Sequence, residues 1–410
     1  MNFLRHSSFS FLFLIAALFL LPFAGVKGIF FGVPIYLPEA AIIFSLGAFF
    51  FGREKKVKNF FPDRWVLFGV MFFIGGSILS FFWNPFSWTG LGMLKSWFLF
   101  PLLFGFLIGC HGHQESRRQR ILFSWWGVMS AVAIANLSLF FQGIVTYDGR
   151  LAGSYSSPNF LAVFVAPMVL LSSYFLLVRQ EKDPLWQKGI FALGGVAGLM
   201  TVFLTRSYET WVALFCSLVF LLGIFAFQKR ISKRILWVGG FFLVLALIVA
   251  IGLERGTEKW QVFTTGGERS SVHSRIMIWE AALQIVADHP LLGIGVGRFQ
   301  EEYLSYQKYF PPYLEWAVPE PHNIFLAVFL STGMLGLAGF LLMLFRFFFL
   351  LLSQVSKKEE ATLLLSLMVL LLLYGLTDTP YFKTDLCFLF FLIFFLGLSL
   401  IQKDSSFQEK

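Results

Sequence analysis

The stretch NFLAVFVAPMVLLSSYFLLV, residues 159–178, runs for 20 residues without one Asp, Glu, Lys, Arg or His. A helix of about 20 apolar residues matches the roughly 30 Å hydrocarbon core of a bilayer. Inside that core the backbone N–H and C=O groups find no water, so they must bond to one another within the helix. The stretch therefore predicts a transmembrane helix.

The composition of the whole chain agrees with this stretch. Of 410 residues, 57% are hydrophobic, 13% are charged and 55 are Phe. Soluble domains carry about 25% charged residues, so this chain cannot cover the surface of a soluble fold of its length. Soluble enzymes, nucleic-acid binders and disordered scaffolds are excluded. The cysteines, Cys110, Cys216 and Cys387, are far apart and lack the spacing of a disulfide framework or a zinc site.

Twelve apolar runs separated by polar breaks predict an all-α polytopic membrane protein with about 12 transmembrane helices and one long outer loop. We expect the spans near residues 8–25, 33–52, 65–83, 91–109, 121–141, 159–178, 187–205, 210–227, 235–253, 322–345, 361–377 and 384–402. The chain then divides into three parts, which are helices one to nine (1–253), the long loop (254–321), and helices ten to twelve with a tail (322–410).

Lysines and arginines alternate between the two sets of connectors. One set holds 21 of the 32, gathered near Arg5 and at 53–64, 117–120, 179–188, 229–234, 346–358 and 403–410. Cytoplasmic loops carry the excess of positive charge in such proteins. Both termini are therefore expected inside and residues 254–321 outside. Phe9 to Phe23 could be the core of a secretory signal, but no small-x-small cleavage site precedes Lys27, so we expect this segment to remain as the first span.

Two patterns stand out within the long loop. Apolar residues recur every three or four positions until Asp288-His289-Pro290 ends the run, which predicts an amphipathic helix resting on the membrane domain or in the lipid interface. Gly293, Gly295 and Gly297 follow; no strand precedes them, so they predict tight backbone turns rather than a nucleotide loop. The residues of the apolar face are Val272, Ile276, Trp279, Leu283 and Val286.

The segment Pro319-Glu320-Pro321-His322-Asn323 leads into an apolar helix that contains Gly333 and Gly336. The two prolines restrict the entry to that helix, and the two glycines permit close packing. An imidazole with a pKa near 6.5 at the water boundary is suited to act as a base. Alternatively, His322 has no catalytic role and is a helix cap or a histidine at the membrane interface.

These segments resemble the shared domain of the O-antigen ligase and O-antigen polymerase superfamily. The resemblance covers roughly residues 145–400. It is carried by Ser274-Arg275 through Trp279, Ala281-Ala282, Asp288-His289-Pro290, Leu292-Gly293-Ile294-Gly295, Gly297, His322-Asn323, Leu326, Gly333 and Leu335-Gly336, and upstream by Arg150, Gly153, Pro158-Asn159, Leu161-Ala162, Leu204-Thr205 and Trp211. One departure is that Arg206 directly follows Leu204-Thr205, two positions before the arginine of the family, where Tyr208 stands here.

The resemblance implies a glycosyltransferase of the bacterial cytoplasmic (inner) membrane with a periplasmic active site. Its donor would be a glycan on a polyprenyl (undecaprenyl) diphosphate carrier, and its acceptor lipid A-core, for a ligase, or a growing glycan, for a polymerase. We favour the ligase. The resemblance implies no cofactor and, besides membrane lipid, no partner such as nucleic acid.

The chemistry of such a transfer needs a base for the acceptor proton and cations for the diphosphate that leaves. We predict His322 as the base and Arg275 with Arg206 as the diphosphate ligands, since the guanidinium fork donates two hydrogen bonds to phosphate oxygens. Secondary candidates are Arg150, Asn159, Asn323, Asp378 and Trp279, with Glu209 and Asp385 as possible substitutes for the acid of Asp378. Neither an Asp-x-Asp pair nor a compact histidine cluster is present, so we predict no metal.

Two hypotheses that assign the protein to other functional classes remain open. A transporter of lipid-linked glycans would place its polar groups near the bilayer midplane and in related halves of the chain. The expected polar groups here lie at the outer ends of the spans. A polysaccharide receptor would use exposed aromatic residues of the long loop as a platform for sugars, and the candidates are Trp260, Tyr303, Tyr306, Tyr309, Tyr313 and Trp316.

Overall fold

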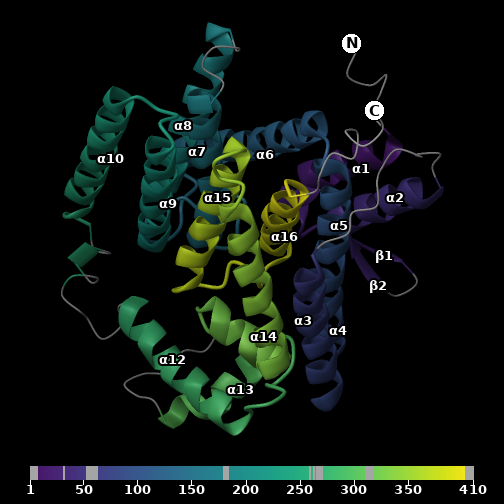
Figure 1. Ribbon diagram of the computed structural model, residues 1–410. Coiled ribbons are helices and arrows are strands. Elements are labelled where there is room, and N and C mark those ends of the chain that lie inside the picture. Colours follow the sequence, from purple (N-terminus) through teal and green to yellow (C-terminus); the bar gives the residue numbers. More distant parts are fainter. Residues whose placement is uncertain are drawn as a thin grey trace.

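A computed structural model describes residues 8–30, 33–51, 63–178, 184–257, 260–261, 264, 271–309 and 318–401. Helices account for nearly all regular structure in these residues, which confirms the all-α polytopic fold (Figure 1). Each predicted span falls on a helix. The helices are α1 (Phe9–Leu20) with η1 (Leu21–Phe23), α2 (Leu37–Phe51), α3 (Arg64–Trp83), α4 (Trp88–Met93) with the π-helical η2 (Leu94–Leu99) and α5 (Phe100–Gly112), α6 (Glu115–Phe141), α7 (Pro158–Val178), α8 (Leu185–Leu204), α9 (Tyr208–Phe227), α10 (Lys233–Glu254), α14 (Ile324–Leu352), α15 (Glu359–Gly375) and α16 (Thr384–Ser399).

In the described part of the chain, 8 helical segments are long and apolar enough to cross a membrane. The helices near the N-terminus and α16 are shorter, and α15 has 17 residues. The count of twelve crossings therefore stays a prediction.

The start of the predicted second span is a strand rather than a helix. β1 (Lys27–Phe30) pairs antiparallel with β2 (Val33–Tyr36), with Lys27 opposite Tyr36. The sequence of β2, Val-Pro-Ile-Tyr, is rich in residues that favour strands, and its proline lacks the N–H group that a helix interior requires. The helix begins only at Leu37.

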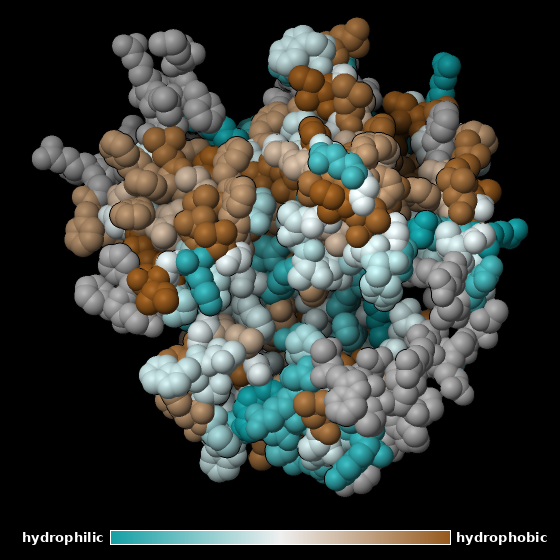
Figure 2. Space-filling view, turned by 180° about the vertical axis from the view of Figure 1, so that it is seen from behind, coloured by the Kyte–Doolittle hydropathy of each residue, from teal (hydrophilic) through white to brown (hydrophobic). Residues whose placement is uncertain are grey.

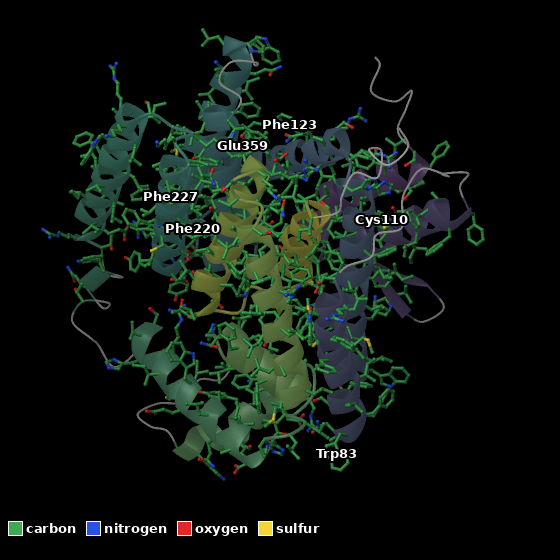
Figure 3. All side chains as sticks on the ribbon, viewed as in Figure 1. Trp83, Cys110, Phe123, Phe220, Phe227 and Glu359 are labelled. Carbon is green, nitrogen blue, oxygen red and sulfur yellow. The ribbon has the colours of Figure 1, made fainter. Side chains whose placement is uncertain are left out.

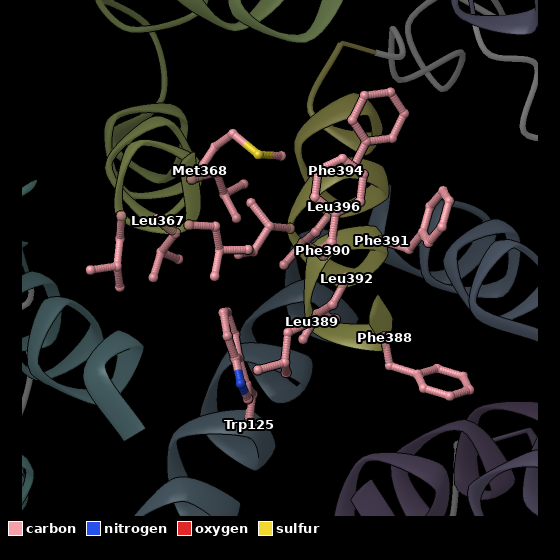
Figure 4. Close-up of a cluster of buried hydrophobic side chains, with 14 of the residues drawn as sticks. Trp125, Leu367, Met368, Phe388, Leu389, Phe390, Phe391, Leu392, Phe394 and Leu396 are labelled. Atoms are coloured by element: carbon pink, nitrogen blue, oxygen red, sulfur yellow. The ribbon is translucent and has the colours of Figure 1, made fainter. Parts of the chain in front are cut away.

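The centre of the bundle is formed by α16, whose residues are buried along its whole length. Phe390 and Phe394 lie on the side of α16 that faces Met368 of α15, with Trp125 of α6 close by (Figure 4). A helix that is apolar on every side is expected where other helices surround it. Because α16 is buried in this way, the loop that connects α15 to α16 is held against the core of the bundle.

Ion pairs join the ends of helices on the side predicted to be cytoplasmic. Arg118 of α6 lies 3.1 Å from Glu360 of α15, and Arg346 of α14 lies 2.9 Å from Asp63, next to α3. Glu359, at this end of α15, lies far from Trp83 at the other end of α3 (Figure 3). The contacts thus connect segments that the charge pattern assigns to one side of the membrane.

Helix α14 contains a break at Gly333, where φ is 69° and ψ is −174°. The glycine-rich loop docks on this break: Ile294 N–H donates to Leu330 O at 2.8 Å, and Met334 N–H donates to Leu291 O at 2.9 Å. Gly293, Gly295 and Gly297 all have positive φ, which confirms the predicted backbone turns. The loop therefore satisfies polar backbone groups that the broken helix leaves open.

Replacing Gly333 by alanine should destabilise the protein by about 1–3 kcal/mol, because an L-residue is strained at this φ. The added Cβ would also lie 2.4 Å from Leu291 O. The midpoint of thermal unfolding in detergent should fall below that of Gly75→Ala, a matched change in α3 where a Cβ meets nothing within 4 Å. Equal midpoints for the two variants would contradict the role assigned to the break.

The predicted amphipathic helix is present as α12 (Ser271–Asp288), and α13 (Phe299–Tyr306) with η3 (Gln307–Tyr309) follows it. The predicted apolar face is largely exposed in the structure, so its placement in the lipid interface stays a prediction. The buried face consists of Met277, Ile278, Ala281, Ala282 and Ile285. Val272, Ile276 and Leu283 are 43%, 43% and 56% exposed, because the small alanines allow the opposite side of α12 to approach its neighbours closely.

Candidate active site

His322 and Asn323 stand at the entry to α14. Asn323 caps the helix: its Oδ1 accepts hydrogen bonds from Phe325 N (3.0 Å) and Leu326 N (3.1 Å), as asparagine commonly does. Its Nδ2 donates to Leu376 O at 3.0 Å, which ties the entry of α14 to the loop after α15. Asn323 therefore has a structural role, and the cap residue is not His322.

The backbone of His322 has a φ of 49°, a left-handed conformation that few residues other than glycine adopt. Arg206 and Lys229 share this conformation, but each directly follows the end of a helix, where it is common. His322 does not end a helix. Such local strain is found preferentially at functional sites.

The imidazole of His322 pairs with Asp378, with Nδ1 3.1 Å from Oδ1. Asp378 is 2% exposed and also accepts hydrogen bonds from Tyr374 Oη (2.7 Å) and Thr379 N (2.8 Å). Burial acts to raise its pKa, but the hydrogen bond and charge of His322, the charge of Arg275 and the Tyr374 hydroxyl together lower the pKa of Asp378 to about 2. Asp378 is thus ionised at neutral pH and can only accept, so in the neutral form of the imidazole Nδ1 carries the proton and Nε2 presents a lone pair.

Helix α12 brings two predicted residues to this pair. Trp279 Nε1 donates to the backbone oxygen of His322 at 3.2 Å. One turn earlier, Arg275 Nη2 lies 3.3 Å from Glu209 Oε1 at the start of α9. The Nε of Arg275 is buried and has no hydrogen-bond partner among the described residues. Residues from three distant parts of the chain therefore meet in one centre, and the candidates His322, Arg275 and Trp279 are among them.

Arg206 lies in a neighbouring group. Its Nε is 3.1 Å from Glu254 Oε1 at the end of α10, and its Nη1 donates to Asp148 O at 3.5 Å. Tyr208, which occupies the position of the family's arginine, donates its hydroxyl to Glu254 Oε2 at 2.9 Å. The short chain segment from Arg206 to Glu209 joins this group to the centre around Arg275.

Arg150 and Asn159 extend the second group. Arg150 Nε is 2.7 Å from Asp148 Oδ2, and its Nη1 donates to Asn159 Oδ1 at 3.5 Å. The pKa of Asp148 is lowered: burial opposes the change, but a hydrogen bond from Thr146 and the charge of Arg150 outweigh it. The secondary candidates Arg150 and Asn159 are therefore connected with Arg206 through Asp148.

Two residues of the centre did not appear among the predicted site residues. Tyr374 is four residues before Asp378, a helical spacing that could have identified it. Glu320 is two residues before His322; burial first, and then the charge of Asp378, raise the pKa of its carboxyl group well above the usual value. Its position between Pro319 and Pro321 gave no signal that the side chain would lie near a second acid.

The aromatic residues that a polysaccharide receptor would use as a platform for sugars do not all lie at the surface. Tyr303 is fully buried, and Tyr306 donates its hydroxyl to Asp288 Oδ2 at 2.8 Å. Tyr313 and Trp316 lie outside the described residues. Of the described residues, no three His, Cys, Asp or Glu side chains are grouped so that they could hold a metal ion. The absence of a metal still rests on the sequence and stays a prediction.

Figure 2 shows the surface of the molecule from behind. Hydrophobic side chains cover much of the upper part, where the helical bundle lies, and hydrophilic side chains gather in the lower part. The surface is hollowed between the two parts and is hydrophilic there. Helices α12 and α13 lie in the lower part (Figure 1), so the end of the bundle that they cover is its more polar end.

The comparison with known families agrees with this geometry. Residues 193–341 match the family described as O-Antigen ligase. The matched region contains Arg206, Glu209, Arg275 and His322, whereas Asp378 lies beyond it. No curated protein matches the chain. Residues 193–341 are thus similar to the O-Antigen ligase family, within a chain whose described residues include helices long and apolar enough to cross a membrane.

Proposed function

We propose that the protein transfers a glycan from an undecaprenyl diphosphate carrier to an acceptor hydroxyl at the outer face of the bacterial cytoplasmic membrane. The observation that carries the proposal is the pairing of His322 with the ionised Asp378, which leaves Nε2 able to take a proton. The acceptor oxygen attacks the anomeric carbon, the carbon–oxygen bond to the diphosphate breaks, and the diphosphate leaves with its electron pair. The hydroxyl proton moves to His322 Nε2, and Asp378 stabilises the imidazolium.

Arg275 and Arg206 are proposed to hold the diphosphate. Each is paired with one carboxylate, Glu209 or Glu254, and the phosphates would replace or share these partners. A guanidinium can bind two phosphate oxygens at once and so stabilise the charge that grows as the diphosphate leaves. Arg150 pairs with Asp148 and with Asn159, and the backbone oxygen of Asp148 accepts a hydrogen bond from Arg206. Arg150 and Asn159 are therefore proposed to hold Arg206 in place.

An apolar cavity beside Arg206 suits the carrier lipid. It has a volume of about 380 Å³ and lies between α8, α9 and α10. Phe203, Trp211 and Leu253 line it, and these residues are close in sequence to Arg206 and Glu254. Part of a polyprenyl chain in this cavity would place the diphosphate at the height of the arginines.

Within this chemistry we favour the ligase, with lipid A-core as acceptor, because the matched family is described as O-Antigen ligase. The polymerase is the second candidate. The purified protein should be supplied with a labelled undecaprenyl-diphosphate oligosaccharide and each acceptor, and the products identified by mass. A single transfer to lipid A-core is expected; a ladder of repeat units would identify a polymerase, and an unchanged donor with both acceptors would contradict the proposal.

The topology gives a separate prediction. Ser305 of α13 and Ser232 before α10 are both exposed, and the charge pattern assigns them to opposite sides of the membrane. In a Cys216→Ser background, which removes the one exposed cysteine of the described residues, Ser305→Cys should react with a membrane-impermeant maleimide in intact spheroplasts. Ser232→Cys should react only after lysis. The reverse labelling would place the candidate site in the cytoplasm and rule out the proposed donor.

A further inference from the structure

Two neighbouring cavities lie beside the β1–β2 hairpin, away from the apolar cavity at Arg206. One has a volume of about 380 Å³ and is lined by polar groups of the 154–156 segment and the start of α16. The other has a volume of about 880 Å³ and is lined mainly by apolar side chains of α3, α4 and η2. Lys27, Tyr36 and Thr384 line both cavities, and Lys27 pairs with Tyr36 in the hairpin.

The polar cavity contains a lysine without a carboxylate at ion-pair distance in the described part of the chain. Lys383 Nζ lies 3.8 Å from the centre of the Phe160 ring and 5.2 Å from that of Tyr155, and it donates to Ser156 Oγ at 3.5 Å. Burial lowers the pKa of Lys383, while the charges of Asp385 and Asp378 act to raise it. Lys383 is only partly buried, and a cation removed from water in part is stabilised by a compensating anion.

Other groups lining the polar cavity agree with an anionic occupant. The hydroxyl of Tyr155 is buried without a hydrogen-bond partner in the described residues, so a ligand oxygen could accept from it. Lys27 adds a second, exposed cation at the mouth. The one acid of the lining, Asp385, is 4% exposed and lies in the first turn of α16.

We propose that these two cavities form a single site for an anionic amphiphile, with a phosphate headgroup in the polar cavity and an acyl chain in the apolar one. The adjoining positions of a cationic and an apolar cavity fit such a molecule and do not fit a free sugar. Lys383 and Asp378 belong to the same loop between α15 and α16, so the occupant would contact the loop that also supplies the partner of His322. Either a bilayer phospholipid or a phosphorylated glycolipid has this chemistry.

The test is native mass spectrometry of the whole, detergent-purified protein titrated with phosphatidylglycerol, with phosphatidylcholine of the same chains, and with glycerol 3-phosphate. Phosphatidylglycerol should bind more tightly than phosphatidylcholine, and Lys383→Gln should weaken its binding about tenfold, as expected for one lost charge-assisted hydrogen bond. Lys233→Gln, the same change at an exposed lysine of α10, should have no effect. Equal binding by the wild type and Lys383→Gln would overturn the proposal.

A second variant tests the apolar cavity on its own. It also gives a test that does not depend on whether Lys383→Gln folds. Ile78 lines the apolar cavity and is 40% exposed, so a larger side chain there should be tolerated. Ile78→Trp should weaken binding of phosphatidylglycerol and leave binding of glycerol 3-phosphate unchanged. Unchanged binding of phosphatidylglycerol would overturn the joint site.

The source of the lipid is decided by repeating the titration with a phosphorylated acyl glycolipid in competition with phosphatidylglycerol. Preference for the glycolipid identifies a glycolipid-binding site, and preference for phosphatidylglycerol identifies a site for a bilayer lipid. Because these measurements record binding and no turnover, they remain informative if the proposed transferase activity fails its own test.

Discussion

Replacing His322 by asparagine should lower turnover by about 10² to 10⁴, the usual cost of losing a general base. Asparagine keeps a hydrogen-bonding side chain of similar reach but cannot take a proton near neutral pH. His322→Ala should lose as much, and binding of the lipid diphosphate donor should be largely unchanged in both variants, because the arginines remain. The rate of transfer and the donor affinity are measured separately on the purified protein.

The matched control is His289→Asn, the same substitution at a partly exposed histidine that follows α12. It should keep full activity. If His322→Asn also retained most of its activity, His322 would be only a structural residue before the cap of α14, and the catalytic assignment would fail.

Arg275→Ala is expected to lower turnover by about 10² to 10³, the size of effect found when one group that stabilises transition-state charge is removed. Arg275→Lys should recover only part of the loss, because an ammonium group lacks the planar fork. Arg206→Ala should behave similarly if Arg206 replaces the displaced arginine of the family. Arg298→Ala is the control, since Arg298 pairs with Glu301 and Glu302 within its own segment.

The ion pair with Glu209 offers a plain structural explanation for such a loss, because Arg275→Ala would leave this carboxylate without its partner. The double variant Arg275→Ala, Glu209→Ala separates the two explanations. If Arg275 holds the diphosphate, the double variant stays inactive. Recovery of activity in the double variant would show that Arg275 serves only to neutralise Glu209.

The positions of the helices could be predicted because bilayer thickness and hydropathy act on each segment alone. The second span was predicted to begin at residue 33, where the structure has a strand, for the same reason. Val-Pro-Ile-Tyr is apolar enough for a transmembrane helix, and only its pairing with β1 shows that it forms a hairpin. The buried face of α12 could not be predicted from periodicity, because the choice between Ile276 and Ile278 depends on which neighbours the helix meets.

The candidate site could be predicted where a motif contains its residues, and it could not be predicted where tertiary packing completes it. His322, Arg275 and Trp279 were identified from their order and spacing, and they do converge. The hydrogen bond from His322 to Asp378 spans 56 positions. The sequence named Asp378 as a candidate acid, with Glu209 and Asp385 as substitutes, but it did not predict that Asp378 would be the partner of His322. The structure forms this pair by folding the loop after α15 against the entry of α14.

The break at Gly333 illustrates the same limit. The glycine was expected to allow close packing within a continuous helix, and Gly336 does lie against Gly76 of α3. The reversal of φ at Gly333 depends on the glycine-rich loop that donates to Leu330 O, about 40 residues earlier in the chain. The local sequence around Gly333 does not show that a loop so far away in the chain will form hydrogen bonds there.

The most direct test of the central claim uses proteoliposomes that carry the labelled lipid diphosphate donor in one leaflet and an acceptor on the same side. The transferase account predicts a new glycosidic bond and one free undecaprenyl diphosphate for each glycan transferred. It also predicts that the His322→Asn protein forms neither at more than about one hundredth of the wild-type rate. Movement of intact donor to the other leaflet without a new bond would contradict it and establish a transporter.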